Sequence, residues 1–177
     1  IKMKYLILLI LLFCLQMTTI FDFQETSDIS NWFVVEDRVM GGESTARFFI
    51  NESGHAQFQG NVSLENNGGF ASVRYDMSAL KVNESGVISI RLKGDGKNYQ
   101  FRVKNRDQNE YAYIAEFPTN GDWQEIQIKL NEMYPSFRGR KLNRPNFSHD
   151  QIEEITFLIG NKRNEKFQLL INKIELK

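Results

Sequence analysis

The chain has very few side chains of the kinds that bind transition metals or act as nucleophiles. Cys14 is its only cysteine, and His55 and His149 are its only histidines. One cysteine excludes an intrachain disulfide framework, and neither histidine has a second histidine or cysteine at zinc-ligand spacing. We therefore expect no metal and no cofactor. One alternative stays open: loop oxygens suffice for calcium, and Asp95 or Asp122 are candidate donors, although each is better explained as a turn residue.

An excess of charge of one sign is also missing. The chain has 22 basic and 22 acidic residues, with no block of like charge. A surface that binds nucleic acid needs a concentrated basic face, so the sequence predicts that nucleic acid is not a partner. The length suits a single domain with one hydrophobic core.

No apolar run is long enough to cross a membrane comfortably as a helix. Residues 5–15 form an apolar run that, at ~1.5 Å per residue, spans roughly half of a ~30 Å hydrocarbon core. Lys2 and Lys4 precede this run and polar residues follow it, which is the pattern of a cleaved secretory signal. We therefore expect residues 1–20 to be a signal peptide and the chain to be exported, to a bacterial periplasm or the extracellular space. A membrane tether is expected only if the signal stays uncleaved.

Proline is scarce, and the three prolines lie outside the strongest strand-like runs. Those runs alternate apolar and polar residues, are rich in β-branched and aromatic side chains, and are separated by glycine and Asx turns. No long amphipathic helix pattern is present. Residues 21–177 are therefore expected to form one all-β domain, a two-sheet sandwich or jelly roll of about ten strands. The expected strands cover residues 47–50, 55–59, 61–65, 70–75, 87–92, 99–103, 111–117, 123–130, 154–159 and 167–176.

One segment breaks this rhythm. Residues 131–150 lack a clear period, and a connection of this length is unusual in a compact domain. Such loops are usually functional or packed as a cap of their own. Ser148 to Asp150 have the character of helix-capping residues, so a short helical turn is expected at residues 151–154.

Two glycine pairs stand in polar segments that lead into strand-like runs. The first ends the stretch Asp37-Arg38-Val39-Met40-Gly41-Gly42, and the second lies within Asn66-Asn67-Gly68-Gly69-Phe70. A glycine pair costs backbone entropy, so its usual reason is a positive φ or a close approach by other backbone. Both segments are therefore expected to adopt a particular loop geometry.

The two glycine segments also carry a resemblance to a known family. They resemble the opening and second blocks of the complex I intermediate-associated protein 30 family, and further blocks follow in the family's order. The resemblance implies a galactose-binding-like β-sandwich without enzymatic activity. It also implies a role like that of the family's mitochondrial member, which assists the assembly of respiratory complex I. The matching blocks include Trp32, 58–60, 71–74, 93–99, Trp123, 137–140 and 167–169.

The glycine segments and one arginine turn contain the candidate contact residues. We expect Asp37 and Arg38 to form a partly buried ion pair that fixes the loop, with Arg74 as a further partner, and we favour loop scaffolding over direct ligand contact. Arg138-Gly139-Arg140 is expected to present two mobile guanidiniums that suit a carboxylate or phosphate partner, although a solvated loop is an equal alternative. No catalytic residue is predicted. The predicted contact residues are Asp37, Arg38, Met40, Gly41, Gly42, Asn67, Gly68, Gly69, Arg74, Arg138 and Arg140.

Aromatic residues distinguish two kinds of binding. Rings on an exposed sheet face suit sugars, whereas the same rings inside a sandwich form its core. Phe101 and Trp123 are expected in the core, whereas Tyr111 and Tyr113 fit either place. The expected function is non-enzymatic, assembly-factor-like binding of a protein client, and the alternative is a carbohydrate-binding module on the same fold. The rings are expected to share one sheet: Tyr99, Phe101, Tyr111, Tyr113, Phe117 and Trp123.

Overall fold

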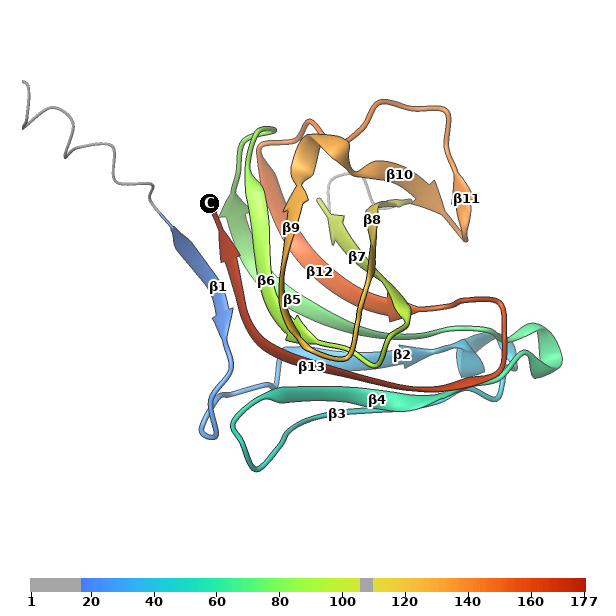
Figure 1. Cartoon of the computed structure of the whole chain (residues 1–177). Helices are drawn as coiled ribbons and strands as arrows, with labels where there is room; N and C mark the ends of the chain where they lie inside the picture. Colours follow the sequence, from blue (N-terminus) through green and yellow to red (C-terminus); the bar gives the residue numbers. More distant parts are fainter. Residues whose placement is uncertain (1–16, 106–109) are drawn as a thin grey trace, which may run out of the picture.

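The computed structural model describes residues 17–105 and 110–177, without the side chains of Val39 and Met40. The chain folds into two antiparallel sheets that pack face to face (Figure 1). The six-stranded sheet has the order β3-β4-β13-β6-β9, with β1 also paired to β13. The seven-stranded sheet has the order β11-β10-β8-β7-β12-β5-β2. The expected two-sheet, all-β sandwich is therefore confirmed.

The first sheet consists of β1 (Thr18–Asp22), β3 (Thr45–Ile50), β4 (Ala56–Val62), β6 (Val87–Lys93), β9 (Trp123–Lys129) and β13 (Glu165–Leu176). The second consists of β2 (Trp32–Glu36), β5 (Ala71–Lys81), β7 (Asn98–Lys104), β8 (Ala112–Pro118), β10 (Tyr134–Phe137), β11 (Arg140–Lys141) and β12 (Gln151–Ile159). In the described part of the chain, 3-10 turns join strands at η1 (Asp37–Met40), η2 (Glu65–Asn67) and η4 (Leu130–Glu132).

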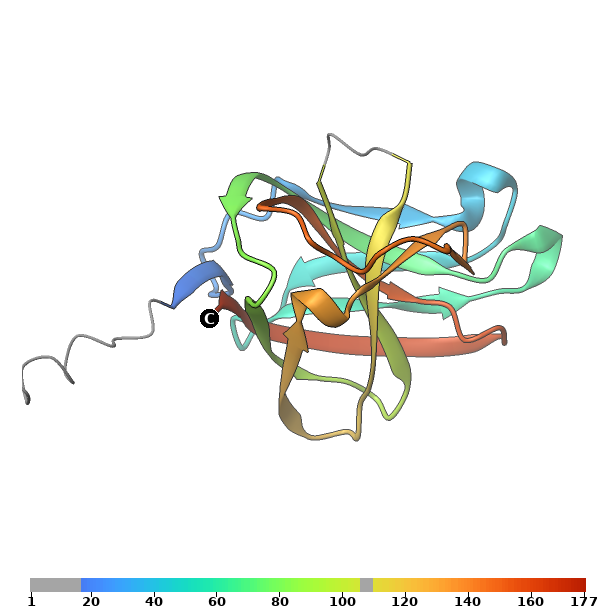
Figure 2. The same ribbon diagram turned by 90° about the horizontal axis from the view of Figure 1, so that it is seen from above.

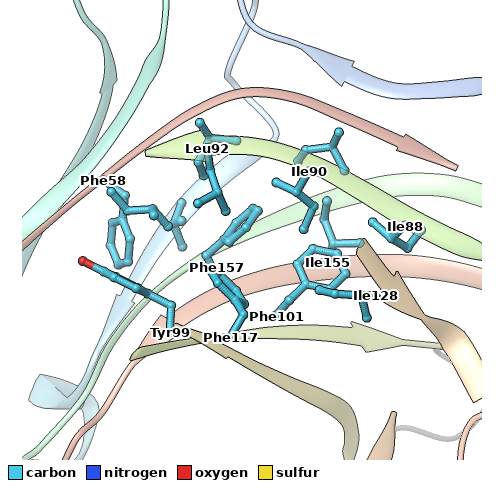
Figure 3. Close-up of a cluster of buried hydrophobic side chains, with 14 of the residues drawn as sticks. Phe58, Ile88, Ile90, Leu92, Tyr99, Phe101, Phe117, Ile128, Ile155 and Phe157 are labelled. Atoms are coloured by element: carbon cyan, nitrogen blue, oxygen red, sulfur yellow. The ribbon is translucent and has the colours of Figure 1, made fainter. Parts of the chain in front are cut away.

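The core lies between the two sheets. Because successive side chains of a strand point to opposite faces, the alternating pattern delivers every second residue to this layer. Phe101 on β7 and Phe157 on β12 meet edge to face with ring centroids 5.3 Å apart. Figure 3 shows them among side chains from both sheets. The residues labelled there are Phe58, Ile88, Ile90, Leu92 and Ile128 from the six-stranded sheet, and Tyr99, Phe101, Phe117, Ile155 and Phe157 from the seven-stranded sheet.

Strand pairing corrects two of the expected elements. Residues 55–59 and 61–65 were expected as separate strands, but β4 runs through Gly60 without a break. A Cβ atom at Gly60 would lie 1.9 Å from the carbonyl oxygen of Thr45, so the glycine permits close approach of β3. Residues 151–154 are part of β12, and the expected helical turn is wrong. Pairing of β12 with both β5 and β7 outweighs the local capping pattern.

The segment 131–150 is more regular than expected. It contains η4 and the β10–β11 hairpin, which extends the seven-stranded sheet at one edge. Phe147 is buried and its backbone N–H donates to the carbonyl of Met133 at 3.0 Å, which ties the rest of the segment to the body. The segment thus serves partly as a cap and partly as sheet.

Trp123 does not lie in the core, contrary to expectation. It lies on β9 of the six-stranded sheet, whereas Tyr99, Phe101, Tyr113 and Phe117 belong to the other sheet. Its side chain has the same parity as the exposed Glu125 and Gln127, and it is 37% exposed. The prediction was wrong because this aromatic residue at the start of a strand was assigned to the core, although it alternates in step with the outward-facing residues of β9.

The chain before Phe21 takes part in the fold. Strand β1 begins at Thr18, within the segment expected to be a signal peptide, and pairs with the C-terminal end of β13. Residues 1–16 lie outside the described part of the chain. Within residues 17–105 and 110–177, no helix has the length and apolar character needed to cross a membrane.

Candidate functional site

The buried carboxylate of Asp37 joins the two glycine segments. Its side chain has no exposed surface and accepts hydrogen bonds from both segments. Oδ1 accepts from the backbone N–H of Ser44 at 3.0 Å, and Oδ2 accepts from the Ser44 hydroxyl at 2.5 Å. The backbone N–H groups of Gly69 and Phe70 donate to Oδ2 at 2.6 and 3.2 Å. We call this arrangement the Asp37 clamp.

Two glycines make room for this carboxylate. A Cβ atom at Gly42 would lie 2.2 Å from Asp37 Oδ1, and one at Gly68 would lie 2.7 Å from Oδ2. Neither glycine is required for a positive φ; the close approach of Asp37 is the reason for each. Gly41 and Gly69 differ, since their φ values of 91° and 132° favour glycine directly. Each pair therefore combines one glycine for space with one for conformation.

Hydrogen bonds determine the ionisation of Asp37. Burial alone raises the pKa of its carboxyl, but the Ser44 hydroxyl and the N–H groups of Gly69, Phe70 and Ser44 together outweigh it. The net pKa of Asp37 lies below its usual value, so the carboxylate is charged at neutral pH. The clamp is therefore a fixed anion satisfied by donors.

The expected ion pairs of Asp37 are wrong. Arg38 is exposed, and its Nε lies 3.6 Å from Glu36 Oε2. Arg74 lies on β5 with its side chain on the solvent side of the seven-stranded sheet. Donors from the backbone and Ser44 satisfy Asp37, so no counter-charge is needed. Asp37, Gly42, Gly68 and Gly69 are thus brought together, whereas Arg38 and Arg74 point elsewhere. Met40 ends η1, and its side chain lies outside the described part.

A further contact links the two loops at the surface. Asn66 Nδ2 donates to Glu43 Oε1 at 3.2 Å, across the clamp. Asn66 and the predicted contact residue Asn67 both have positive φ, 53° and 61°, and both are exposed. Asparagine tolerates this conformation better than most residues, which explains its presence at both positions.

Arg138 and Arg140 lie at the opposite edge of the seven-stranded sheet from η1. Arg138 and Gly139 form the two-residue turn between β10 and β11, with φ of 47° and 74°, and both arginines are exposed as expected. The Arg138 guanidinium lies over the Phe137 ring, with Cζ 5.2 Å from its centroid. Figures 1 and 2 both show η1, η2 and this hairpin toward the same end of the sandwich. The three predicted segments therefore flank the sheet and do not form one continuous patch.

A site that the sequence did not indicate lies between these edges. Six side chains align in one row across six strands, on the side of the seven-stranded sheet that faces away from the core. We call this side the outer face. Arginines on β5 and β7 stand at the centre of the row, on either side of Thr156. The row is Phe33, Arg74, Thr156, Arg102, Ile114 and Tyr134, in strand order β2-β5-β12-β7-β8-β10.

A hydrogen-bond network connects two residues of this row, Arg102 and Tyr134. Arg102 donates to Gln100 Oε1 through Nε at 3.1 Å and through a terminal nitrogen at 2.6 Å. Gln100 Nε2 in turn donates to Glu116 Oε1 at 3.0 Å, and the Tyr134 hydroxyl donates to the same oxygen at 3.2 Å. Burial lowers the pKa of Arg102, and the charge of Arg74 lowers it further. The centre of the outer face therefore concentrates positive charge in a partly dehydrated setting.

Apolar residues accompany these charges. Ala112, Ile114 and Leu158 are buried, yet they do not belong to the core cluster. They alternate with core residues on β8 and β12, so they face outward and are shielded by neighbours on the outer face. Phe33 at the β2 edge is 39% exposed. The outer face thus offers cations together with one exposed apolar ring, that of Phe33.

Tyr113 of β8 and Tyr111, which comes just before this strand, pack under the 131–150 segment. The Tyr113 hydroxyl lies 2.8 Å from His149 Nε2 and 3.3 Å from the Tyr111 hydroxyl. Arg144 Cζ lies 5.2 Å from the centroid of the Tyr111 ring. Burial raises the pKa of Tyr113, and its hydrogen bond with the Tyr111 hydroxyl adds to this effect. These rings are internal packing for the cap and are not an open platform.

The other sheet carries a shallow hollow of about 740 Å³ next to the 94–97 turn. Asp95 lines it but is already engaged: it accepts from Lys97 Nζ at 2.6 Å, from the Tyr99 hydroxyl at 2.9 Å and from the backbone N–H of Gln168 at 3.0 Å. Asp95 is therefore a turn residue, as the sequence favoured. In the described ranges, no group of three or more histidine, cysteine, aspartate or glutamate side chains is arranged to hold a metal.

The family of this chain follows from its sequence profile. The profile described as Complex I intermediate-associated protein 30 (CIA30) matches residues 21–171. The chain belongs to this family. A curated relative, the mitochondrial complex I intermediate-associated protein 30 of Mus musculus, is 23% identical over 186 residues. The match covers 89% of this chain and 55% of the relative, so this CIA30 chain spans little more than half of that protein.

Solved structures show which fold the CIA30 domain has. A family 11 carbohydrate-binding module of Clostridium thermocellum, solved with a β-1,3-1,4-mixed-linked tetrasaccharide, matches with a TM-score of 0.67 and 13% identity. The match covers 90% of this chain and 94% of the module. An exo-β-agarase matches with a TM-score of 0.56 and 11% identity, over 90% of this chain and 24% of the enzyme. The fold is the galactose-binding-like sandwich that the resemblance implied.

The expectation of export is contradicted by these comparisons. The curated CIA30 relative from Mus musculus is a mitochondrial protein, and this finding speaks against a bacterial periplasm or the extracellular space. The expectation rested on Lys2, Lys4 and the apolar run that follows them. Such a pattern shows only that a segment is apolar and is preceded by positive charge. It does not identify the targeting receptor that recognises the segment.

Proposed function

We propose that this CIA30 domain is a non-enzymatic, assembly-factor-like domain that binds a protein client on the outer face of the seven-stranded sheet. The row from Phe33 to Tyr134 carries the proposal. It places an exposed phenylalanine, two arginines and a tyrosine in one line across six strands. Protein interfaces favour this combination of aromatic and arginine side chains.

The family relationship supports a protein client. The family's name associates it with an intermediate of complex I. Carboxylates on the outer face have partners: Glu116 accepts from Gln100 and Tyr134, and Glu154 accepts from Thr156 at 3.3 Å. Both acids are thus engaged in positioning neighbouring side chains, and this supports binding over acid–base catalysis.

Site-specific photocrosslinking tests the proposal. A photoreactive phenylalanine analogue at Phe33, the exposed ring on the outer face, should crosslink to a defined protein in extract from the source cells. The same substitution at Gln127, on the outer side of the six-stranded sheet, should not. The captured protein should then bind the purified chain saturably and with 1:1 stoichiometry. Equal crosslinking from the two positions would show that the outer face is not the binding surface.

A carbohydrate ligand is the second candidate. The network of Gln100, Glu116 and Tyr134 sets hydrogen-bonding groups beside an aromatic ring, as sugar sites do, and the fold is shared with carbohydrate-binding modules. Affinity electrophoresis in gels containing mixed-linked β-glucan tests it. Retardation that Tyr134→Ala abolishes and Trp123→Ala preserves would favour the sugar. Free migration in this and other polysaccharide gels would eliminate it.

A further inference from the structure

We propose that Arg74 and Arg102 form a carboxylate-binding seat on the outer face, and that its ligand is an acidic segment of a protein client. This inference rests on the proposed function, because it names the chemistry of the client at that same face. It adds the part of the client that is recognised and the two residues that recognise it.

The two arginines lie close enough together for one ligand to reach both. Their strands flank β12, and Thr156 pairs with Arg74 on one side and with Arg102 on the other. Two strand spacings separate their backbones by about 9.6 Å. Both side chains are half-buried and lie on the outer face. A carboxylate placed over Thr156 therefore lies within reach of both long side chains.

The lack of a counter-charge carries the second step. Within residues 17–105 and 110–177, neither Arg74 nor Arg102 forms an ion pair with a carboxylate. Arg102 is oriented by a neutral group, Gln100, which takes two of its five donor hydrogens. Half-buried arginines are usually paired, and two of them side by side repel each other. An incoming anion would relieve this repulsion and use the free donors.

The neighbours indicate what kind of anion fits. Ile114 stands next to Arg102 in the row, and Phe33 stands next to Arg74. Ile114 is itself buried, so the apolar surface open to a ligand is the Phe33 ring, which is 39% exposed. A peptide that carries both acidic and apolar side chains can pair with the arginines and cover this ring at once. A small inorganic anion would leave the ring in water, and a polysaccharide acid lacks aliphatic side chains.

Glu116 helps to keep Arg102 oriented and available for a ligand. It could have neutralised Arg102, but its Oε1 is held by Gln100 and Tyr134, and Gln100 stands between it and the guanidinium. The charge of Glu116 nonetheless raises the pKa of Arg102 and opposes the effect of burial. Arg102 is therefore kept protonated and oriented while its remaining donors stay available.

The test measures binding of a labelled peptide to the purified full chain. The probe is a ten-residue peptide with four glutamates and two leucines, and its control has glutamine at the four positions. Fluorescence anisotropy should show saturable binding of the acidic peptide that weakens at least tenfold for Arg74→Gln and for Arg102→Gln. Arg47→Gln, an exposed arginine on β3 of the other sheet, should bind as the unchanged chain does. Arg102→Lys keeps the charge but loses the fork, so intermediate binding is expected.

Several results would overturn the inference. Equal affinity in Arg47→Gln and Arg74→Gln would do so, and Arg74→Gln is informative even if Arg102→Gln misfolds, which circular dichroism would detect. Equal binding of the glutamine peptide would remove the role of charge. Tighter binding of polygalacturonate would assign the seat to an acidic polysaccharide, and displacement by inorganic phosphate at equal concentration would assign it to any small anion.

Photocrosslinking separates this inference from the proposed function. If the analogue at Phe33 still crosslinks to the client in the Arg74→Gln/Arg102→Gln variant with unchanged yield, the outer face is the interface but the arginines are not its carboxylate seat. If the analogue at Phe33 gives no adduct when both arginines are present, the proposed function itself fails.

Discussion

At the residue scale, the two glycine pairs have their explanation in one carboxylate. Asp37 is a buried anion satisfied by donors from Ser44, Gly69 and Phe70. Burying a charge is energetically costly unless the charge is paired or hydrogen-bonded. Here backbone N–H groups and a hydroxyl supply the hydrogen bonds. The clamp joins Asp37 to residues 32 and 33 positions further along the chain, so its loss should weaken the whole sandwich edge.

We predict that Asp37→Asn destabilises the protein by about 1–3 kcal/mol, because the new NH₂ group faces donors in place of an acceptor. Urea unfolding at neutral pH measures the change. Asp122→Asn, at an exposed turn position, is the matched control and should remain within ±0.5 kcal/mol of the unchanged chain. A cost no larger than that of the control would show that the clamp does not hold the loops.

Asp37 should also contribute to acid sensitivity. Its folded-state pKa lies below the value in the unfolded chain, so its stabilisation is fully present above the unfolded pKa, at about 4. That stabilisation is lost as the pH falls through the folded-state pKa. The free energy of unfolding of Asp37→Asn should therefore depend less steeply on pH below about 4 than that of the unchanged chain. Parallel curves for the two proteins would contradict the assignment.

We predict that Gly42→Ala is more disruptive than Gly96→Ala. A Cβ at Gly42 would overlap Asp37 Oδ1, whereas nothing lies within 4 Å of a Cβ at Gly96. Gly96 has φ of 82°, so alanine there costs backbone strain of about 1 kcal/mol. Overpacking at Gly42 should cost about 1–3 kcal/mol and also perturb the Ser44 hydrogen bonds. Thermal unfolding and amide shifts of Ser44 would show both effects; a milder effect at Gly42 would argue against the close contact.

At the element scale, pairing decided structures that local patterns did not. Strand β12 occupies residues whose capping pattern favoured a helical turn, because β5 and β7 provide ladder partners on both sides. The β10–β11 hairpin forms because Arg138 and Gly139 both take positive φ, as a two-residue turn demands. The hairpin then positions Tyr134 at one end of the outer-face row.

The hairpin turn offers a prediction about stability. Asparagine adopts positive φ more readily than arginine, and β-branched residues do so poorly. Arg138→Asn should therefore keep or slightly raise the melting temperature. Arg138→Val should lower stability by about 1 kcal/mol or more. Differential scanning calorimetry compares them, and hydrogen exchange at Ser136 reports whether β11 remains paired. Equal stability of the two variants would contradict the positive φ at this position.

At the scale of the whole molecule, the two sheets have different tasks. Their facing sides form the core, and the outer face of the seven-stranded sheet carries the aligned arginines. The outer side of the six-stranded sheet carries Trp123, with Arg91 Cζ 5.6 Å from its ring centroid and the His55 ring 4.8 Å away. The face of the sheet on which a ring lies therefore decides which aromatic residues support the fold.

We predict a large contrast between Phe101→Ala and Trp123→Ala. Phe101 is fully buried, and its loss should cost about 3–5 kcal/mol by leaving a cavity. Trp123 lies on the solvent side, so its loss should cost less than ~1 kcal/mol. Urea unfolding measures both. In addition, acrylamide should quench Trp123 more than the buried Trp32. A cost at Trp123 comparable to that at Phe101 would mean that the indole is part of the core.

The order of apolar and polar residues was sufficient to predict the all-β sandwich and most of its strands, whereas the family was recognised from the resemblance of several sequence blocks. A period of two is a local property, because adjacent side chains of a strand point to opposite faces. The glycine pairs could likewise be recognised in the sequence as positions with a particular loop geometry, because the backbone entropy that they cost is a local property.

Only the tertiary structure decided which residues meet. Register across six strands aligns Arg74 with Arg102, and these residues are far apart in sequence and share no motif. The same holds for Asp37, whose partners at Gly69 and Phe70 follow from the folding of two loops onto each other. Strand order and register are set by packing over the whole domain, so a candidate site built from them has no signature within any one segment.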